Sequence, residues 1–226
     1  MIYQMSDKPM FSLGDDENGA RLISIHDISL NIAPDQVNKL KNVDGLYSKE
    51  TSNVTGCNFR NIFINGLHYG INLNVVNGGG ITENSFINVA LMRNVVGMCL
   101  NTSTTDNPAW FNHNYFRLCY INENTSGGVL VNGIKSVQTI LFQSCNFENN
   151  GKNYSESDYA ELGCFAFKAS NMLYGNILFD SCYFENTYPR DVRNTLHSNF
   201  NTSREAHIIF GSGQLEVRNS IIARTR

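Results

Sequence analysis

Two stretches of the chain share one frame: FQSCNFENN at residues 142–150 and FDSCYFENT at residues 179–187. Both contain the frame F-x-S-C-x-F-E-N, and they begin 37 residues apart. Apolar and polar residues alternate within the second half of the frame, which is typical of a β-strand with one buried face. A local pattern that recurs along a chain at such a distance indicates a repeat architecture.

The second phenylalanine of the frame serves as an anchor for finding further copies. Equivalent anchors, 27 to 37 residues apart, occur at Leu30, Phe59, Phe86, Phe116, Phe147, Phe184 and Ile221. Two positions before each anchor, on the same face, stand Ile28, Cys57, Asn84, Asn114, Cys145, Cys182 and Asn219. A second apolar strand follows each of five anchors, at residues 71–73, 98–100, 129–131, 165–167 and 208–210. The sequence therefore predicts short strands that stack on their equivalents in the next repeat.

This pattern predicts an all-β fold, specifically a right-handed single-stranded parallel β-helix, a solenoid of about six to seven coils. Helical repeats are excluded because no stretch of about ten residues shows a 3.6-residue period. Stacked asparagine amides would hydrogen-bond from coil to coil across ~4.8 Å. Cys145 and Cys182 would be neighbours in such a stack, but parallel side chains favour free thiols over a disulfide.

We expect residues 1–226 to form a single β-helix domain that is a fragment of a longer protein. Phe11 and Leu13 have the pattern of a second strand whose anchor is missing, and the last anchor, Ile221, is followed by no capping helix. Solenoid ends without caps expose strand edges that other domains or subunits must cover.

Composition limits the partners. The net charge of -3 gives no electrostatic reason to expect nucleic acid, and no apolar run approaches the length needed for membrane insertion. Asparagine is abundant, with 32 residues, and the charged fraction is only 16%. Neither the cysteines nor the histidines have metal-ligand spacing, so we expect no metal and no cofactor.

The segments CNFRN (57–61), GINL (70–73) and NGGGITENSF (77–86) resemble the right-handed parallel β-helix of the pectate-lyase-like superfamily. Within it, the asparagine-rich coils with uneven loops are most similar to bacteriophage tailspikes, over about residues 11–225. The resemblance implies a homotrimeric virion protein, made in the bacterial cytoplasm, that binds and usually cleaves a bacterial surface polysaccharide. A secreted or cell-surface location is the alternative. No catalytic motif carries over from the resemblance.

The residue after each anchor should point outward, which places Glu148 and Glu185 on adjacent coils. The expected strand spacing of ~4.8 Å is close to the carboxyl separation of about 5–5.5 Å in retaining glycosidases. The competing interpretation is a solvated ladder in which Arg117, one coil earlier, pairs with Glu148.

Asp180 is a further catalytic candidate, with a hydrogen bond at a bend as its alternative role. It is a charged residue in a column whose other members are neutral: Thr55, Thr82, Asn112 and Gln143.

The two longest insertions, 150–163 and 187–206, follow Glu148 and Glu185 and should form neighbouring walls of one surface feature. They supply a catalytic candidate, Asp158, and the candidate sugar-binding residues Tyr154, Tyr159, Tyr188, Arg190, Arg193 and His197. Oligomer contacts explain these insertions equally well. Trp110 lies elsewhere and is either a sugar platform or a ring packed on the coil.

These residues predict an endo-glycosidase that hydrolyses capsule or O-antigen through paired carboxylates. A polysaccharide lyase would instead use Arg, Tyr or His beside an acidic sugar. A non-catalytic adhesin or a structural shaft is the third possibility. A concave site with the carboxylate pair facing into it would favour the enzyme, whereas a flat surface with Glu148 paired to Arg117 would favour binding or scaffolding.

Overall fold

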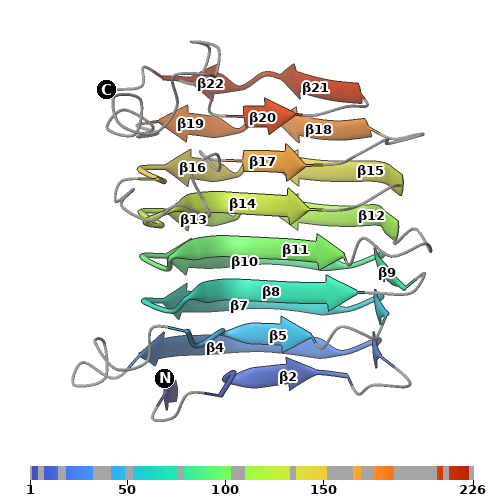
Figure 1. Ribbon diagram of the computed structural model, residues 1–226. Coiled ribbons are helices and arrows are strands. Elements are labelled where there is room, and N and C mark those ends of the chain that lie inside the picture. Colours follow the sequence, from blue (N-terminus) through green and yellow to red (C-terminus); the bar gives the residue numbers. More distant parts are fainter. Residues whose placement is uncertain are drawn as a thin grey trace, which may run out of the picture.

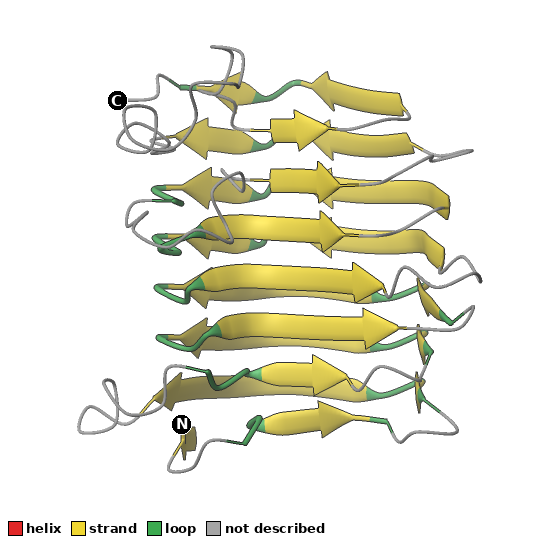
Figure 2. Ribbon diagram, in the orientation of Figure 1, coloured by secondary structure: helices red, strands yellow, loops and turns green. Residues whose placement is uncertain are grey.

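The computed structural model describes residues 2–4, 8–14, 19–32, 42–48, 53–75, 79–102, 110–132, 136–151, 165–168, 176–185, 208–210 and 214–223. Every regular element in these ranges is a β-strand, and the strands form two parallel sheets (Figures 1 and 2). The prediction of an all-β fold with parallel stacking is confirmed.

The larger sheet has 15 strands. They are β1 (Ile2–Gln4), β3 (Ala20–Arg21), β4 (Ser24–Ile32), β6 (Val54–Thr55), β7 (Asn58–Asn65), β9 (Gly80–Thr82), β10 (Ser85–Met92), β12 (Trp110–Arg117), β13 (Tyr120–Asn122), β15 (Ser136–Gln143), β16 (Asn146–Glu148), β18 (Asn176–Asp180), β19 (Tyr183–Glu185), β21 (Gln214–Arg218) and β22 (Ile221–Ile222). Each strand pairs in parallel with its equivalent one repeat later, so the chain climbs the stack from blue to red in Figure 1.

The smaller sheet has seven strands. They are β2 (Phe11–Leu13), β5 (Leu46–Ser48), β8 (Tyr69–Val75), β11 (Val96–Thr102), β14 (Gly127–Asn132), β17 (Phe165–Lys168) and β20 (Ile208–Phe210). The predicted second strands pair in register: Met98 with Val129, and Val129 with Phe165. The prediction that the first repeat lacks its anchor is wrong. Ile2 of β1 occupies the anchor position, because it pairs with the anchor Leu30 of the next repeat.

Stacked phenylalanines form the core between the sheets. Five of them, all fully buried, follow one another with ring centroids 4.4–4.8 Å apart: Phe59, Phe86, Phe116, Phe142 and Phe179. A second stack joins Phe147 to Phe184 at 4.9 Å. Each buried ring removes a large apolar area from water, so these stacks stabilise the contacts between repeats.

The two stacks correct the predicted frame, which placed all anchors in one column. Phe116 pairs with Phe142, whereas Phe147 pairs with Ile121. The anchors Phe147 and Phe184 therefore belong to a column that runs back to Leu30, five residues further along the chain than the column of Phe59. Both columns face inward and both contain phenylalanine, so the sequence frame fits either one.

Bends separate the strands of each repeat and use left-handed backbone. The bend between the two columns has φ of 51° to 57° in every repeat, at Asp27, Asn61, Asn88, Leu118, Ser144, Ser181 and Asn219. Asparagine and aspartate tolerate this conformation better than most residues, which accounts for part of the asparagine content.

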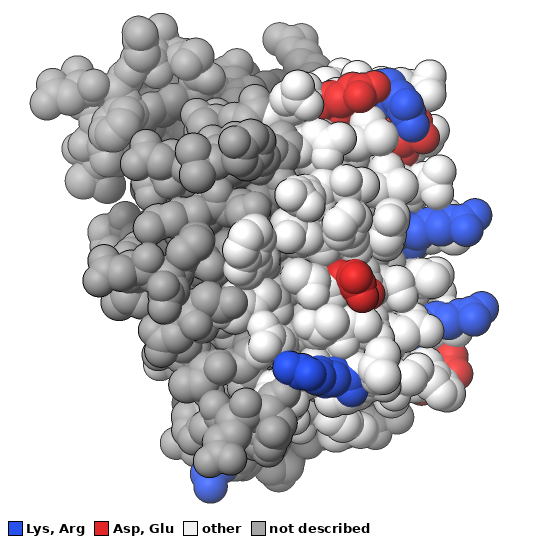
Figure 3. Space-filling view, turned by 90° about the vertical axis from the view of Figure 1, so that its right-hand side faces the viewer, with Lys and Arg blue, Asp and Glu red and all other residues white. Residues whose placement is uncertain are grey.

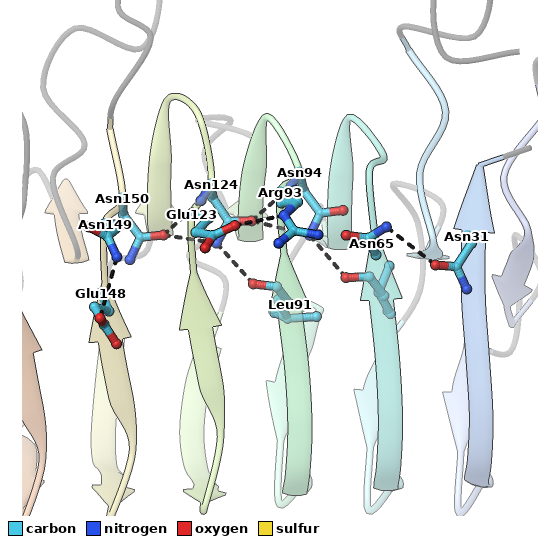
Figure 4. Close-up of polar contacts among 11 residues, drawn as sticks. Asn31, Asn65, Leu91, Arg93, Asn94, Glu123, Asn124, Glu148, Asn149 and Asn150 are labelled. Atoms are coloured by element: carbon cyan, nitrogen blue, oxygen red, sulfur yellow. Dashed lines mark hydrogen bonds and ion pairs between the residues drawn. The ribbon is translucent and has the colours of Figure 1, made fainter. Parts of the chain in front are cut away.

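Buried amides link successive repeats, as predicted. Asn84 Nδ2 donates to Asn114 Oδ1 at 3.0 Å. A second amide ladder, which was not predicted, lies at the bend that leads into the smaller sheet: Asn94, Asn124 and Asn150 (Figure 4).

Cys119, Cys145 and Cys182 fill equivalent inward positions, whereas Cys57 lies in another column and Cys99 lies in the smaller sheet. Cys57, Cys99, Cys119, Cys145 and Cys182 are buried free thiols, and Cys164 lies outside the described residues.

Candidate functional site

The outer face of β4, β7, β10, β13, β16 and β19 carries two columns of side chains. The middle residues of these strands, such as Ile121 and Phe147, are fully buried, so their neighbours on either side face outward. One column, here called the ring column, contains Ser29, Phe63, Ala90, Tyr120, Asn146 and Tyr183. The other, the polar column, contains Asn31, Asn65, Met92, Asn122, Glu148 and Glu185.

Glu148 and Glu185 are directly opposite each other on the adjacent strands β16 and β19. Their predicted adjacency is confirmed, with a strand spacing of ~4.8 Å. Both side chains are half-buried. Glu148 Oε1 accepts a hydrogen bond from Asn149 Nδ2 at 3.4 Å (Figure 4), and the backbone N–H of Glu148 donates to Asn122 Oδ1 at 3.1 Å.

Tyr183 completes a cluster with the two carboxylates. Its hydroxyl donates to Glu185 Oε2 within the same strand. This hydrogen bond, then burial and then the negative charges of Glu185 and Glu148 raise the pKa of Tyr183. The phenol therefore keeps its proton and remains a donor to Glu185.

Arg117 does not neighbour Glu148, so the predicted ion pair between them is wrong. Arg117 is opposite Gln143, in the column that precedes the bend, whereas Glu148 is opposite Asn122 and Glu185. The error follows from the shift between the two phenylalanine columns. Among the residues that the structure describes, neither glutamate of the pair forms an ion pair with a cation.

Asp180 also belongs to a different column from the one predicted. It is opposite Gln143, as expected, but Thr55 and Thr82 lie in another column, which continues to Asn112. The bend at Ser181 separates Asp180 from β19.

The contacts of Asp180 are those of the predicted alternative, a hydrogen-bonded bend. Its carboxylate accepts from Asn219 Nδ2 at 3.1 Å and from Ser181 Oγ at 3.4 Å, and it lies 3.4 Å from Arg218 Nε. The hydrogen bond from Asn219 and the charge of Arg218 lower the pKa of Asp180 despite its partial burial. Asp180 is thus a tethered, ionised carboxylate.

Trp110 begins β12 and is 42% exposed, beside Gly80 and Ser136 on the neighbouring strands. Seven other predicted site residues lie outside the described residues: Tyr154, Asp158, Tyr159, Tyr188, Arg190, Arg193 and His197. The segments that contain them follow β16 and β19, which are paired strands.

The rest of the described surface adds no competing centre. It contains no group of three His, Cys, Asp or Glu residues arranged to hold a metal ion. No helix in the described ranges is long and apolar enough to cross a membrane. Figure 3 shows the side of the molecule that lies at the right of Figure 1, and the described part of this side is mostly uncharged.

The sequence interpretation missed Tyr120 and Tyr183. Both stand one residue before an inward-facing residue, at positions equivalent to Asn146. In the sequence, an outward ring beside an inward apolar residue is hard to distinguish from a core residue.

Comparisons of the chain with protein-family models, with curated proteins and with solved structures found no match. Its function is therefore inferred from its own geometry.

Proposed function

We propose that the chain is a right-handed parallel β-helix of the tailspike type, which binds a bacterial capsule or O-antigen polysaccharide and hydrolyses its glycosidic bonds. Support for this fold comes from the parallel pairing of every described repeat in both sheets. Crossovers between parallel strands of one sheet are right-handed in about 98% of cases. The proposal includes a homotrimer on a virion, in which neighbouring copies contribute residues to the site.

The observation that carries the proposal is that the carboxyl groups of Glu148 and Glu185 stand on directly opposite residues. Like charges directly opposite on adjacent strands destabilise a sheet, and no described cation offsets this pair. Violations of local stability rules are expected at functional sites. A structural ladder does not explain why two half-buried carboxylates meet here.

The roles follow from the contacts. Glu185, held by the Tyr183 hydroxyl, is the nucleophile that attacks the anomeric carbon. Glu148 donates its proton to the departing glycosidic oxygen, so that bond breaks as the glycosyl–Glu185 ester forms. Glu148 then takes a proton from water, which cleaves the ester and releases the sugar with its configuration retained. The strand spacing of ~4.8 Å favours this retaining course over inversion, which needs about 6.5–9.5 Å.

A lyase is less well supported at this position. Elimination needs a base that removes the C5 proton, and the raised pKa of Tyr183 makes its phenolate scarce at neutral pH.

The test is incubation of the full chain with a panel of purified capsular and O-antigen polysaccharides. New reducing ends and the ultraviolet absorbance of unsaturated uronates are read together, for the wild type and for Glu148→Gln and Glu185→Gln. Glu123→Gln is the matched control, because Glu123 is an exposed glutamate paired with Arg93 at 2.7 Å (Figure 4). We expect reducing ends without absorbance, lost in both site variants and kept in the control. Absorbance would establish a lyase, and binding without either product would establish an adhesin.

A further inference from the structure

The ring column has a two-strand period. Aromatic residues come from every second strand, Phe63 from β7, Tyr120 from β13 and Tyr183 from β19. Between them stand the smaller side chains Ala90 and Asn146. With strands ~4.8 Å apart, successive rings are about 9.6 Å apart along the stack.

The polar column does not alternate in this way, because every strand except β10, which carries Met92, supplies a hydrogen-bonding residue to it. Each strand that supplies a ring also supplies a hydrogen-bonding side chain two residues later, on the same face: Asn65, Asn122 and Glu185. A ring and a polar group therefore recur together on every second strand, and the last such pair includes the proposed nucleophile.

Two side-chain oxygens under this surface have no hydrogen-bond partner. In the part of the chain that the structure describes, the side-chain oxygens Asn65 Oδ1 and Asn146 Oδ1 are buried without a hydrogen-bond partner. Buried acceptors without partners are rare in native proteins and costly, and these two are covered by the protein itself. Tyr120, midway along the column, is 46% exposed and offers its ring to solvent.

We propose that a linear polysaccharide lies along the stack of strands on this surface, with one contact repeat for every two strands. This rests on the proposed function and specifies how its substrate is bound. The period of about 9.6 Å has the length of a disaccharide unit, so every second sugar packs on a ring and its hydroxyls bond the neighbouring polar group. Tyr120 is then a binding residue two strands away from the cleavage point at Glu185.

Tyr115 provides a matched control on the same repeat. It is 44% exposed, close to the value for Tyr120, but lies on the other side of the bend at Leu118. Its column continues into Leu141 and Leu178, so no second ring follows it on the next two strands.

The experiment measures binding by full-length chains that carry Glu148→Gln, so that the ligand is not consumed. The ligands are oligosaccharides of graded length, made by partial acid hydrolysis of whichever polysaccharide in the panel the chain binds. Tyr120→Ala should weaken the Kd of long oligosaccharides about tenfold, while Tyr115→Ala changes it less than about twofold. Oligosaccharides too short to span two strands beyond Glu185 should bind both variants equally. Circular dichroism checks that the variants fold.

The outcomes separate the two proposals. The proposed binding mode along the stack is overturned if Tyr120→Ala leaves binding unchanged or if Tyr115→Ala weakens it as much. Either result leaves the proposed polysaccharide function standing. A wild-type chain that binds no polysaccharide in the panel overturns both. The binding mode along the stack is supported if affinity rises in steps of two sugars and if only Tyr120→Ala weakens it.

Discussion

The amide ladder of Asn94, Asn124 and Asn150 gives the sharpest test of how successive repeats are held together. Asn124 is its middle member. Asn124 Oδ1 accepts from the backbone N–H of Asn94 at 3.1 Å and from Asn94 Nδ2 at 3.2 Å. Asn124 Nδ2 donates to the carbonyl of Leu91 at 3.0 Å and to Asn150 Oδ1 at 2.9 Å (Figure 4). Asn124→Ala removes all four hydrogen bonds at a fully buried position.

The expected loss is about 4 kcal/mol, from a net value of about 1 kcal/mol for each of the four hydrogen bonds. Groups left buried without a partner, such as the N–H of Asn94, move the value upward rather than downward. Asn58→Ala is the control, since Asn58 is exposed and accepts one hydrogen bond, from Ser85 Oγ at 3.1 Å. An exposed truncation of this kind should cost less than about 0.5 kcal/mol.

Urea denaturation followed by far-UV circular dichroism measures both variants against the wild type, with the midpoint and the slope compared. The reasoning is refuted if Asn124→Ala lies within about 1 kcal/mol of Asn58→Ala, which is a quarter of the expected loss. A changed slope would show instead that the repeats no longer unfold together.

Three further predictions concern the core and the bends. Gly97→Ala should lower the free energy of unfolding by about 1–3 kcal/mol, because a Cβ there would lie 2.6 Å from the carbonyl oxygen of Gly128 and would overpack the contact. An unchanged urea midpoint would contradict this prediction. Cys99, whose pKa burial raises to about 12, should not react with a disulfide reagent at about pH 8, near the ordinary thiol pKa of about 8.5, until the chain is unfolded, so rapid labelling of Cys99 in the native protein would disprove its burial. Asp180, whose pKa the hydrogen bond from Asn219 lowers, stabilises the fold above the unfolded-state pKa of about 3.9 and loses this contribution as pH falls through its lower folded value. Urea midpoints measured from pH 7 to pH 3 (roughly the range in which carboxylates titrate) should therefore fall less steeply for Asp180→Asn, and parallel curves would show that Asp180 contributes nothing.

Local alternation was enough to predict the strands and their parallel stacking. The frames that contain Cys145 and Cys182 do occupy adjacent strands, and Glu148 does meet Glu185. The alignment of the middle repeat was wrong because period-2 alternation restarts after each bend, and a left-handed bend such as that at Leu118 leaves an inward residue on both sides. Matching phenylalanine to phenylalanine then joined Phe116 to Phe147 instead of to Phe142.

The site was predicted less completely, for a related reason. Outward rings and inward rings alternate along β19, where Tyr183 and Phe184 are consecutive, and a single sequence does not state which one is exposed. The two-strand period of the ring column appears only when the true register is known, because it compares residues 57 to 63 positions apart, such as Phe63 with Tyr120 and Tyr120 with Tyr183.

The corrected register changes the weight of the two explanations for the glutamates. The solvated ladder required Arg117 to lie beside Glu148 and to pair with it. The structure places Arg117 beside Gln143 and gives the nearby Asp180 its own cation, Arg218. Charge balance is thus supplied to the carboxylate at the bend, whereas the pair at Glu148 and Glu185 has only a phenol and an amide as described partners. The fold can pair an acid with arginine one column away, so the lack of a cation beside Glu148 and Glu185 among the described residues supports the proposal that they act on a ligand.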